Sequence, residues 1–336
     1  MKRSTALIAA LLLLASRAAA QDAAPLRQVQ TIPLPDVAGR IDHMAADVDG
    51  HRIFLSGLEN NTVEVIDAQA GKRVQTLKGF KKPQGQAYLA GLKKLYVANG
   101  EDGSCRVFDG ESLAPLHNVM VSLGADALAY DAREKLMYLG SGGSDAHKDY
   151  GDLTVFDVTT DAIVTTIRTD AHASGAAIEG AGGRVFDLVA EKNQIVVIDR
   201  KTHAVLDKWV VPDVTKVPAI ALDEADHRLF VASRTPARFI VIDSDSGKVV
   251  ASLPTVGIVD GLSYDPDTKH IYVTGGEGFL VVHRQIDADH YDTLARIPTG
   301  PVARTSLFVP EWKRLYVAVP RNKDAGAEVR VFDTQP

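Results

Sequence analysis

Short apolar segments alternate with polar turns along the whole chain, and one pattern of segments recurs seven times. Each copy contains a segment such as RIFLSG or KLYVAN, then a loop, then a segment such as VEVID or CRVFD. Runs of this length that are rich in β-branched and aromatic residues and bounded by turn residues predict β-strands. One aromatic residue anchors each copy: Phe54, Tyr96, Tyr138, Phe186, Phe230, Tyr272 and Tyr316.

The spacing between the anchoring aromatics predicts the fold. The copies recur every 42 to 48 residues, and each has room for an alanine-rich inner strand, two central strands and an outer strand such as RVQTL. Four-stranded units of this size are propeller blades, because such a sheet buries both faces only when neighbouring blades stack on it. A linear solenoid would need capping repeats, which the two ends do not show. We therefore predict an all-β protein, a single seven-bladed β-propeller of four-stranded antiparallel blades, over residues 21–336.

The two ends of the chain predict how the ring closes. The seventh copy stops after its VFD segment at residues 331–333 and has no outer strand. Residues 27–32 (RQVQTI) closely match residues 72–77 (KRVQTL), the outer strand of the first complete copy. We expect the N-terminal strand to pair with the C-terminal blade, which leaves no long exposed edge.

The repeated segments also carry a family resemblance. LYVANG, IYVTGG and RLYVAV, each followed by a VID or VFD strand, resemble the YVTN-repeat β-propellers of exported bacterial and archaeal proteins, over residues 26–333. The resemblance implies a seven-bladed, WD40-like propeller related in shape to the haem d1 domain of cytochrome cd1, and it implies no particular activity. The signatures of WD40 and kelch blades themselves are absent. A covalent c-type haem is not expected, because its attachment motif needs two cysteines and the chain has one.

Residues 1–20 have the features of a secretory signal peptide. They combine a basic start, an apolar run of ten residues and a small-residue end at Ala18 to Ala20. The apolar run is short of the roughly 20 residues that span a bilayer. We therefore expect cleavage after Ala20 and a periplasmic or secreted protein without a transmembrane anchor.

The net charge and the single cysteine limit which partners and which cross-links the protein is expected to have. Cleavage removes Lys2, Arg3 and Arg17, so the formal net charge falls from −6 to −9. A surface of that sign repels phosphate backbones, and no nucleic-acid partner is expected. Cys105, the single cysteine, leaves an exported fold without an internal disulfide and is predicted to pack as a small buried side chain. The protein is expected to be a monomer.

One position of the repeat predicts a functional site. Twelve residues before each anchoring aromatic, the inner strands begin and should ring one mouth of the central channel. Carboxylates, an arginine and a glutamine occupy this ring where glycine or serine would satisfy packing. With two neighbouring histidines, the candidate ligand-binding residues are Asp42, His43, Gln84, Asp126, His172, Asp260 and Arg304. The competing interpretation is that each aspartate bonds backbone amides at a turn.

This residue set leaves the function open. Its oxygen and nitrogen atoms suit a divalent metal ion or an acid/base pair. The leading hypothesis is a binding module that recognises a small molecule, a metal ion or a partner protein at the channel face. The alternative is an enzyme of the lactonase, lyase or hydrolase type, with or without a divalent metal, and a purely structural propeller is a third. No linear catalytic motif decides between them.

The loops between second and third strands should emerge on the same face as the candidate ring. They carry charged residues such as Glu101 and Arg234, and the longest, residues 141–151, is a candidate lid. The aspartates that end the VID-type strands are interpreted as turn residues: Asp67, Asp109, Asp157, Asp199, Asp243 and Asp333. His283 is predicted to replace this aspartate in the sixth copy.

Overall fold

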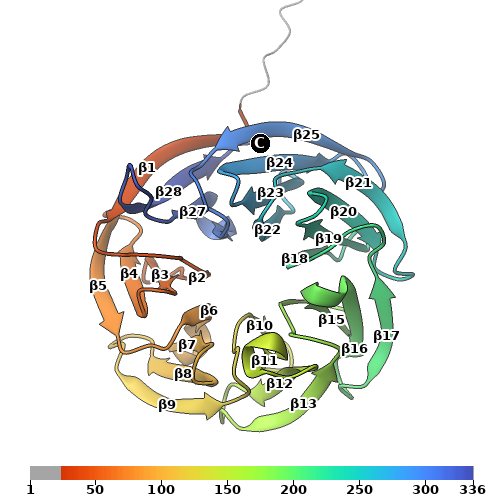
Figure 1. The fold of residues 1–336 in the computed structure, drawn as a ribbon, viewed down its shortest axis with the longest axis horizontal. Helices are drawn as coiled ribbons and strands as arrows, with labels where there is room; N and C mark the ends of the chain where they lie inside the picture. Colours follow the sequence, from red (N-terminus) through yellow and green to blue (C-terminus); the bar gives the residue numbers. More distant parts are fainter. Residues whose placement is uncertain (1–23, 336) are drawn as a thin grey trace, which may run out of the picture.

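Seven four-stranded antiparallel sheets form a ring in the computed structural model, which describes residues 24–335 (Figure 1). Within each sheet the strands are joined in up-and-down order, with one strand at the axis and one at the perimeter. The predicted fold class is confirmed. The predicted signal peptide, residues 1–20, lies outside the described residues. Among residues 24–335 no helix is long and apolar enough to cross a membrane.

The first four blades follow the chain from the first inner strand. Blade one contains β2 (Met44–Asp47), β3 (Arg52–Gly57), β4 (Thr62–Asp67) and β5 (Lys72–Lys78). Blade two contains β6 (Pro83–Leu89), β7 (Lys94–Asn99), β8 (Ser104–Asp109) and β9 (Pro115–Met120). Blade three contains β10 (Leu128–Asp131), β11 (Leu136–Gly142), β12 (Gly151–Asp157) and β13 (Ile163–Thr169). Blade four contains β14 (Ala176–Ile178), β15 (Arg184–Val189), β16 (Gln194–Asp199) and β17 (Val205–Val210).

The remaining three blades complete the ring. Blade five contains β18 (Ala219–Asp223), β19 (Arg228–Ser233), β20 (Arg238–Asp243) and β21 (Val249–Pro254). Blade six contains β22 (Val259–Asp265), β23 (His270–Gly275), β24 (Phe279–Gln285) and β25 (Tyr291–Pro298). Blade seven contains β26 (Ser306–Val309), β27 (Arg314–Val319), β28 (Ala327–Thr334) and β1 (Leu26–Leu34). Short 3₁₀ turns are η1 (Ala90–Leu92), η2 (Gly143–Ala146), η3 (Ala190–Lys192) and η4 (Pro310–Trp312).

Blade seven joins the two ends of the described chain. β1 pairs antiparallel with β28, from Leu26 opposite Thr334 to Leu34 opposite Ala327. The register shifts between Gln28 and Gln30, and an equivalent shift occurs between the third and fourth strands of every other blade. β1 therefore has the bulged geometry of an outer strand, as the sequence match with β5 predicts.

Apolar side chains between neighbouring blades hold the ring together. The seven anchoring aromatics are at most 1% exposed, and each lies in a cluster shared by two adjacent blades. Cys105 is fully buried in one such cluster, which confirms the packing role predicted for it, and burial raises the pKa of its thiol. The core is thus divided among seven interfaces, because each sheet buries its faces only against its neighbours.

The ends of the third strands confirm some predictions and correct two. In five blades the carboxylate of the terminal aspartate accepts hydrogen bonds from the backbone N–H groups two and three residues later in the chain. These aspartates are Asp67, Asp109, Asp157, Asp199 and Asp243. The turn role is wrong for Asp333, which pairs instead with Arg27 and Arg314. The prediction for His283 is also wrong by one residue. Arg284 lies at the position in the strand that the aspartate has in the other blades. His283 is fully buried and its ring is stacked on that of Phe239. Burial lowers the pKa of His283 to about 4.

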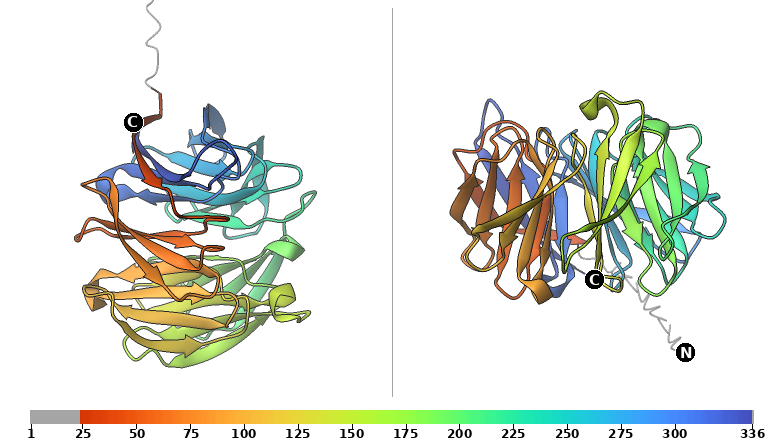
Figure 2. Two further views of the ribbon diagram at one scale, coloured as in Figure 1. Left: turned by 60° about the vertical axis from the view of Figure 1, so that its left-hand side comes forward. Right: turned by 90° about the horizontal axis from the view of Figure 1, so that it is seen from below.

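Loops between second and third strands gather on one face of the disc. Figure 2 shows η2, in yellow-green, projecting beyond the ends of the strands on that face. The turns between first and second strands lie on the opposite face, because the strands run up and down within each blade.

Candidate functional site

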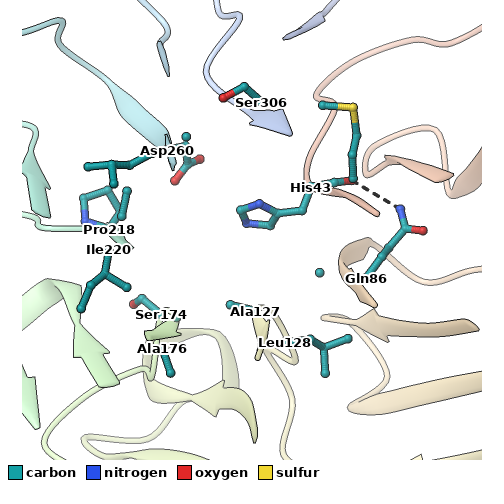
Figure 3. Close-up of a pocket in the computed structure, with 16 residues that line it drawn as sticks. His43, Gln86, Ala127, Leu128, Ser174, Ala176, Pro218, Ile220, Asp260 and Ser306 are labelled. Atoms are coloured by element: carbon teal, nitrogen blue, oxygen red, sulfur yellow. Dashed lines mark hydrogen bonds between the residues drawn. The ribbon is translucent and has the colours of Figure 1, made fainter. Parts of the chain in front are cut away.

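Five of the seven predicted site residues line a vestibule at one mouth of the channel: His43, Gln84, Asp126, His172 and Asp260. Asp42 and Arg304 do not line it; Asp42 contacts His43 and Arg40, and Arg304 contacts Asp260. The vestibule has a volume of about 270 Å³ and is lined from six of the seven blades. It adjoins a channel cavity of about 200 Å³, and His43, Ser174, Pro218 and Asp260 line both. Figure 3 shows the His43 imidazole pointing into the channel between the side chains of Asp260 and Ser174 on one side and Gln86 on the other. Side chains separated by up to 220 residues of sequence therefore share one space.

Asp260 is surrounded by three arginines from three blades. Its Oδ1 lies 3.0 Å from Nη2 of Arg234, and its Oδ2 lies 3.1 Å from Nε of Arg304 and 3.8 Å from Nη2 of Arg40. Arg234 also donates from Nε to the carbonyl of Val259. Burial lowers the pKa of Arg304, although the Asp260 carboxylate opposes that effect. The three guanidinium groups are shared between two carboxylates, because Arg40 also donates to Asp42.

Asp42 and His43 lie next to each other beside Arg40. Asp42 is 1% exposed, accepts a hydrogen bond of 3.0 Å from Nη2 of Arg40, and has its Oδ1 3.5 Å from Nε2 of His43. Burial raises the pKa of Asp42 to about 6, against the opposite effect of His43 and Arg40. Burial lowers the pKa of His43, but the carboxylates of Asp42, Asp126 and Asp260 outweigh it and the net shift is upward. The surroundings of the pair therefore shift the pKa of both groups upward.

Buried polar atoms without hydrogen-bond partners are concentrated at this mouth. Within residues 24–335 they include two donors and three acceptors here: Arg40 Nε, Arg304 Nε, Asp42 Oδ1, Asp126 Oδ1 and Asp260 Oδ2. Some of these atoms make ion-pair contacts, but without hydrogen-bond geometry. Leaving a buried polar group unpaired costs about 1–3 kcal/mol, so such atoms are rare unless something else satisfies them. The mixture of donors and acceptors calls for a partner that both accepts and donates.

Two of the predicted site residues use their polar groups within the protein. Gln84 donates from Nε2 to the carbonyl of Ala125 at 3.0 Å. The His172 Nε2 lies 2.8 Å from the carbonyl oxygen of Gly124, so this nitrogen carries the proton and donates it. Both side chains line the vestibule but also tie neighbouring blades together. Asp42, His43, Asp126, Asp260 and Arg304 remain, and their role as ligand-binding residues stays a prediction.

The geometry of the vestibule does not favour the hypothesis of a bound metal ion. Among residues 24–335 no three His, Cys, Asp or Glu side chains are grouped closely enough to hold a metal ion. The arginines around Asp260 also repel a cation.

The sequence analysis missed three residues of the vestibule. Arg40 and Lys216 lie two residues before the ring position in blades one and five, and Glu191 lies in the loop after β15. His172 occupies the same repeat position as Arg40 and Lys216, so comparing one further position across the blades would have found both. Ser144 and Asp145 of the 141–151 loop line the vestibule, while movement of this loop as a lid stays a prediction.

Comparisons with known proteins support the fold. No protein-family model matches the chain. The uncharacterized protein YncE of Salmonella typhi is 25% identical over 219 residues, which cover 62% of this chain and 57% of that protein. The protein of the same name from Salmonella typhimurium is 24% identical over the same lengths. The match thus spans 57% of the length of each curated relative.

Two solved structures have the same architecture. A chain of the Kuenenia stuttgartiensis hydrazine synthase aligns with a TM-score of 0.73 at 18% identity, covering 84% of this chain and 94% of that one. A chain of a mitotic checkpoint complex aligns with a TM-score of 0.77 at 13% identity, covering 100% and 99%. The chain shares their propeller fold. At these identities the likeness concerns the fold alone.

Proposed function

We propose that this protein is an exported β-propeller that binds a small polar molecule at the mouth of its channel. The observation that carries the proposal is the set of buried donors and acceptors without partners around the vestibule. The volume of about 270 Å³ is just below the range of about 300–1,000 Å³ that takes drug-sized ligands, which favours a metabolite-sized one. The groups come from different blades of a rigid ring, which keeps them in place without a ligand.

The unpaired atoms indicate the chemistry of the ligand. Among the residues that line the vestibule, Arg40 offers a donor to carboxylate or hydroxyl oxygens. Asp126 and Asp260 offer acceptors to hydroxyl or ammonium groups. A polyhydroxylated acid or an amino acid carries both kinds of group, whereas a simple anion or a simple cation carries only one.

A thermal-shift screen of sugar acids, hydroxy acids and amino acids tests the binding role. A ligand at 100 times its Kd contributes about 2.7 kcal/mol and should raise the unfolding midpoint by roughly 5 °C. Arg40→Gln and Asp260→Asn should abolish the shift given by such a compound. Arg330→Gln, which breaks a pair with Glu328 on β28, is the control and should respond like the wild type. A screen without any shift, or equal shifts in the site variants, would contradict the proposal.

Export is part of the proposal and has its own test. It is supported by the basic start, short apolar run and small-residue end of residues 1–20. N-terminal sequencing of the protein recovered from the periplasm or the medium of a bacterial expression host should begin at Gln21. Recovery of only uncleaved protein in the cytoplasmic fraction would count against export.

The Asp42–His43 pair favours a second candidate function. Perturbed titrating groups that face a pocket are frequent at catalytic sites, and this pair can move a proton between neighbouring groups. The second candidate is therefore a lactonase, lyase or hydrolase that uses the pair as acid and base. His43→Asn distinguishes the two functions, because it should remove turnover of a lactone or ester while a ligand from the screen still binds.

A further inference from the structure

On the face opposite the vestibule, at the junction of blades two and three, side-chain donors surround the carboxylate of Asp161. Asp161 lies in the turn after β12 of blade three. Its carboxylate accepts a hydrogen bond of 2.6 Å from the hydroxyl of Tyr96 and one of 2.5 Å from Nζ of Lys94. The Nε2 of His117 on the outer strand β9 lies 2.9 Å from the same carboxylate. The Asp161 side chain is only 4% exposed, so these groups replace the water that a carboxylate otherwise requires.

The junction of blades seven and one has the same donors but lacks the carboxylate. Arg314 and Tyr316 occupy the positions of Lys94 and Tyr96 in the repeat. Gly71 occupies the position of Asp161, because each lies four residues after the aspartate that ends the third strand. Gln30 of β1 corresponds to His117 of β9 and places its side-chain amide where a Cβ at position 71 would lie.

The donors at this junction are available to a ligand. The Tyr316 side chain is 1% exposed, and its hydroxyl has no hydrogen-bond partner among the described residues. Arg314 lies beside it but only donates hydrogen bonds, so it cannot take the hydroxyl proton. The guanidinium of Arg314 contacts Asp333 through Nε at 3.3 Å. Burial raises the pKa of Tyr316, which keeps it a donor at neutral pH. The Tyr138 hydroxyl also lacks a hydrogen-bond partner among the described residues, but there the His203 ring lies edge-on to the Tyr138 ring, with 6.3 Å between the ring centroids.

A cavity opens in front of these donors. It has a volume of about 240 Å³ and is lined by His51, Ala68, Gln69, Trp312, Arg314 and Tyr316. The rings of His51 and Trp312 are stacked at 5.8 Å, and the Trp312 ring meets the edge of Tyr316 at 6.0 Å. The cavity therefore combines an aromatic wall with an arginine and a tyrosine hydroxyl, a pairing suited to a flat ring that carries an acid group.

We propose that this cavity, between blades seven and one, is a second binding site, for a small aromatic carboxylate. The carboxylate of the ligand accepts hydrogen bonds from the Tyr316 hydroxyl and the Arg314 guanidinium, and its ring packs against Trp312. The site is separate from the vestibule, because His51 and Arg314 precede the second strands of their blades while the vestibule loops follow them.

Benzoate and its neutral analogue benzamide test the proposal. The chain has two tryptophans, so a Trp209→Phe background excited at the red edge of the absorption band leaves Trp312 as the only tryptophan that reports. Benzoate should change the Trp312 emission in a saturable way. Benzamide should bind at least about tenfold more weakly, because a hydrogen bond to a charged group contributes about 1.5–3 kcal/mol. Equal responses to both compounds, or none, would overturn the proposal.

Three variants separate this site from a general effect on the fold. Tyr316→Phe should weaken benzoate about tenfold, whereas Tyr96→Phe, the matched change at the filled junction, should leave benzoate affinity unchanged. Gly71→Asp should restore an internal carboxylate, raise the unfolding midpoint and block benzoate. Residue 71 has a φ of +62°, close to the +57° of Asp161, so aspartate is tolerated once the Gln30 side chain rotates away. A folded Gly71→Asp variant that binds benzoate like the wild type would refute the site, and Tyr316→Phe decides if that variant does not fold.

Discussion

Deletion of residues 26–34 is expected to lower the free energy of unfolding by about 5 kcal/mol or more, enough to unfold much of the protein at 37 °C. β1 buries Leu26, Ile32 and Leu34, and each such side chain contributes about 1.5–3 kcal/mol. Its loss also exposes the full edge of β28, which pairs with β1 along its length. The total is comparable with the stability of a whole domain, about 5–15 kcal/mol. Circular dichroism during thermal and urea unfolding measures the effect.

Two single substitutions separate the role of β1 in the fold from the effect of shortening the chain. Ile32→Asp places a charge at a position with 0% exposure in the cluster that joins blades seven and one, and should destabilise nearly as much as the deletion. Val29→Asp lies on the same strand at the bulge, where the side chain is 38% exposed, and should change the midpoint little. A deletion variant that melts at the wild-type temperature would show that β1 does not close the ring.

Asp187→Val is expected to stabilise the protein by about 2–5 kcal/mol at neutral pH. The Asp187 carboxyl in β15 is fully buried, and neither of its oxygens has a hydrogen-bond partner among the described residues. Burying an unpaired polar group costs about 1–3 kcal/mol, and valine adds apolar contact at nearly the same volume. The equivalent residues of the other blades are all aliphatic: Leu55, Val97, Leu139, Val231, Val273 and Val317. Urea unfolding of both proteins at pH 7 measures the difference.

The benefit of Asp187→Val should grow with pH. Burial raises the pKa of Asp187 well above its ordinary value, so the carboxyl stays protonated in the folded protein, while in the unfolded chain it ionises near pH 4. The wild type therefore loses stability as pH rises above about 4, and the valine variant lacks this component. Asp42, with a pKa of about 6, acts in the same sense in both proteins and cancels in the comparison.

An amide at the same position is the matched control. Asp187→Asn removes the titration but keeps an unpaired polar group, so it should lose the pH dependence and gain little stability at pH 4. A valine variant less stable than the wild type, or a difference that does not change between pH 4 and pH 8, would show that Asp187 has a partner in solution.

The propeller itself could be predicted from the sequence because its information is local and repeated. Each blade encodes its own strands, and the anchoring aromatics from Phe54 to Tyr316 count the blades directly. The match between residues 27–32 and 72–77 also predicted the pairing of β1 with β28. The repeat even located the vestibule, because a shared position in seven blades must form a ring.

The chemistry of the site depends on differences between blades, which the repeat pattern does not describe. Arg40 and Asp260 are 220 residues apart, and only closure of the ring brings the guanidinium within 3.8 Å of the carboxylate. Gln84 belongs to the predicted ring but donates to the backbone of the next blade, which depends on the reach of one side chain.

The sequence by itself determined the number of blades, the strand order and the seam, since these follow from short-range alternation of apolar and polar residues. Only the tertiary structure decided which polar atoms lack partners, such as those of Asp187 and Tyr316, because pairing depends on what the neighbouring blade presents at distances near 3 Å. The apolar pattern of a strand does not depend on the exact position of a neighbouring blade, whereas a hydrogen bond does, and both proposed binding sites depend on hydrogen bonds.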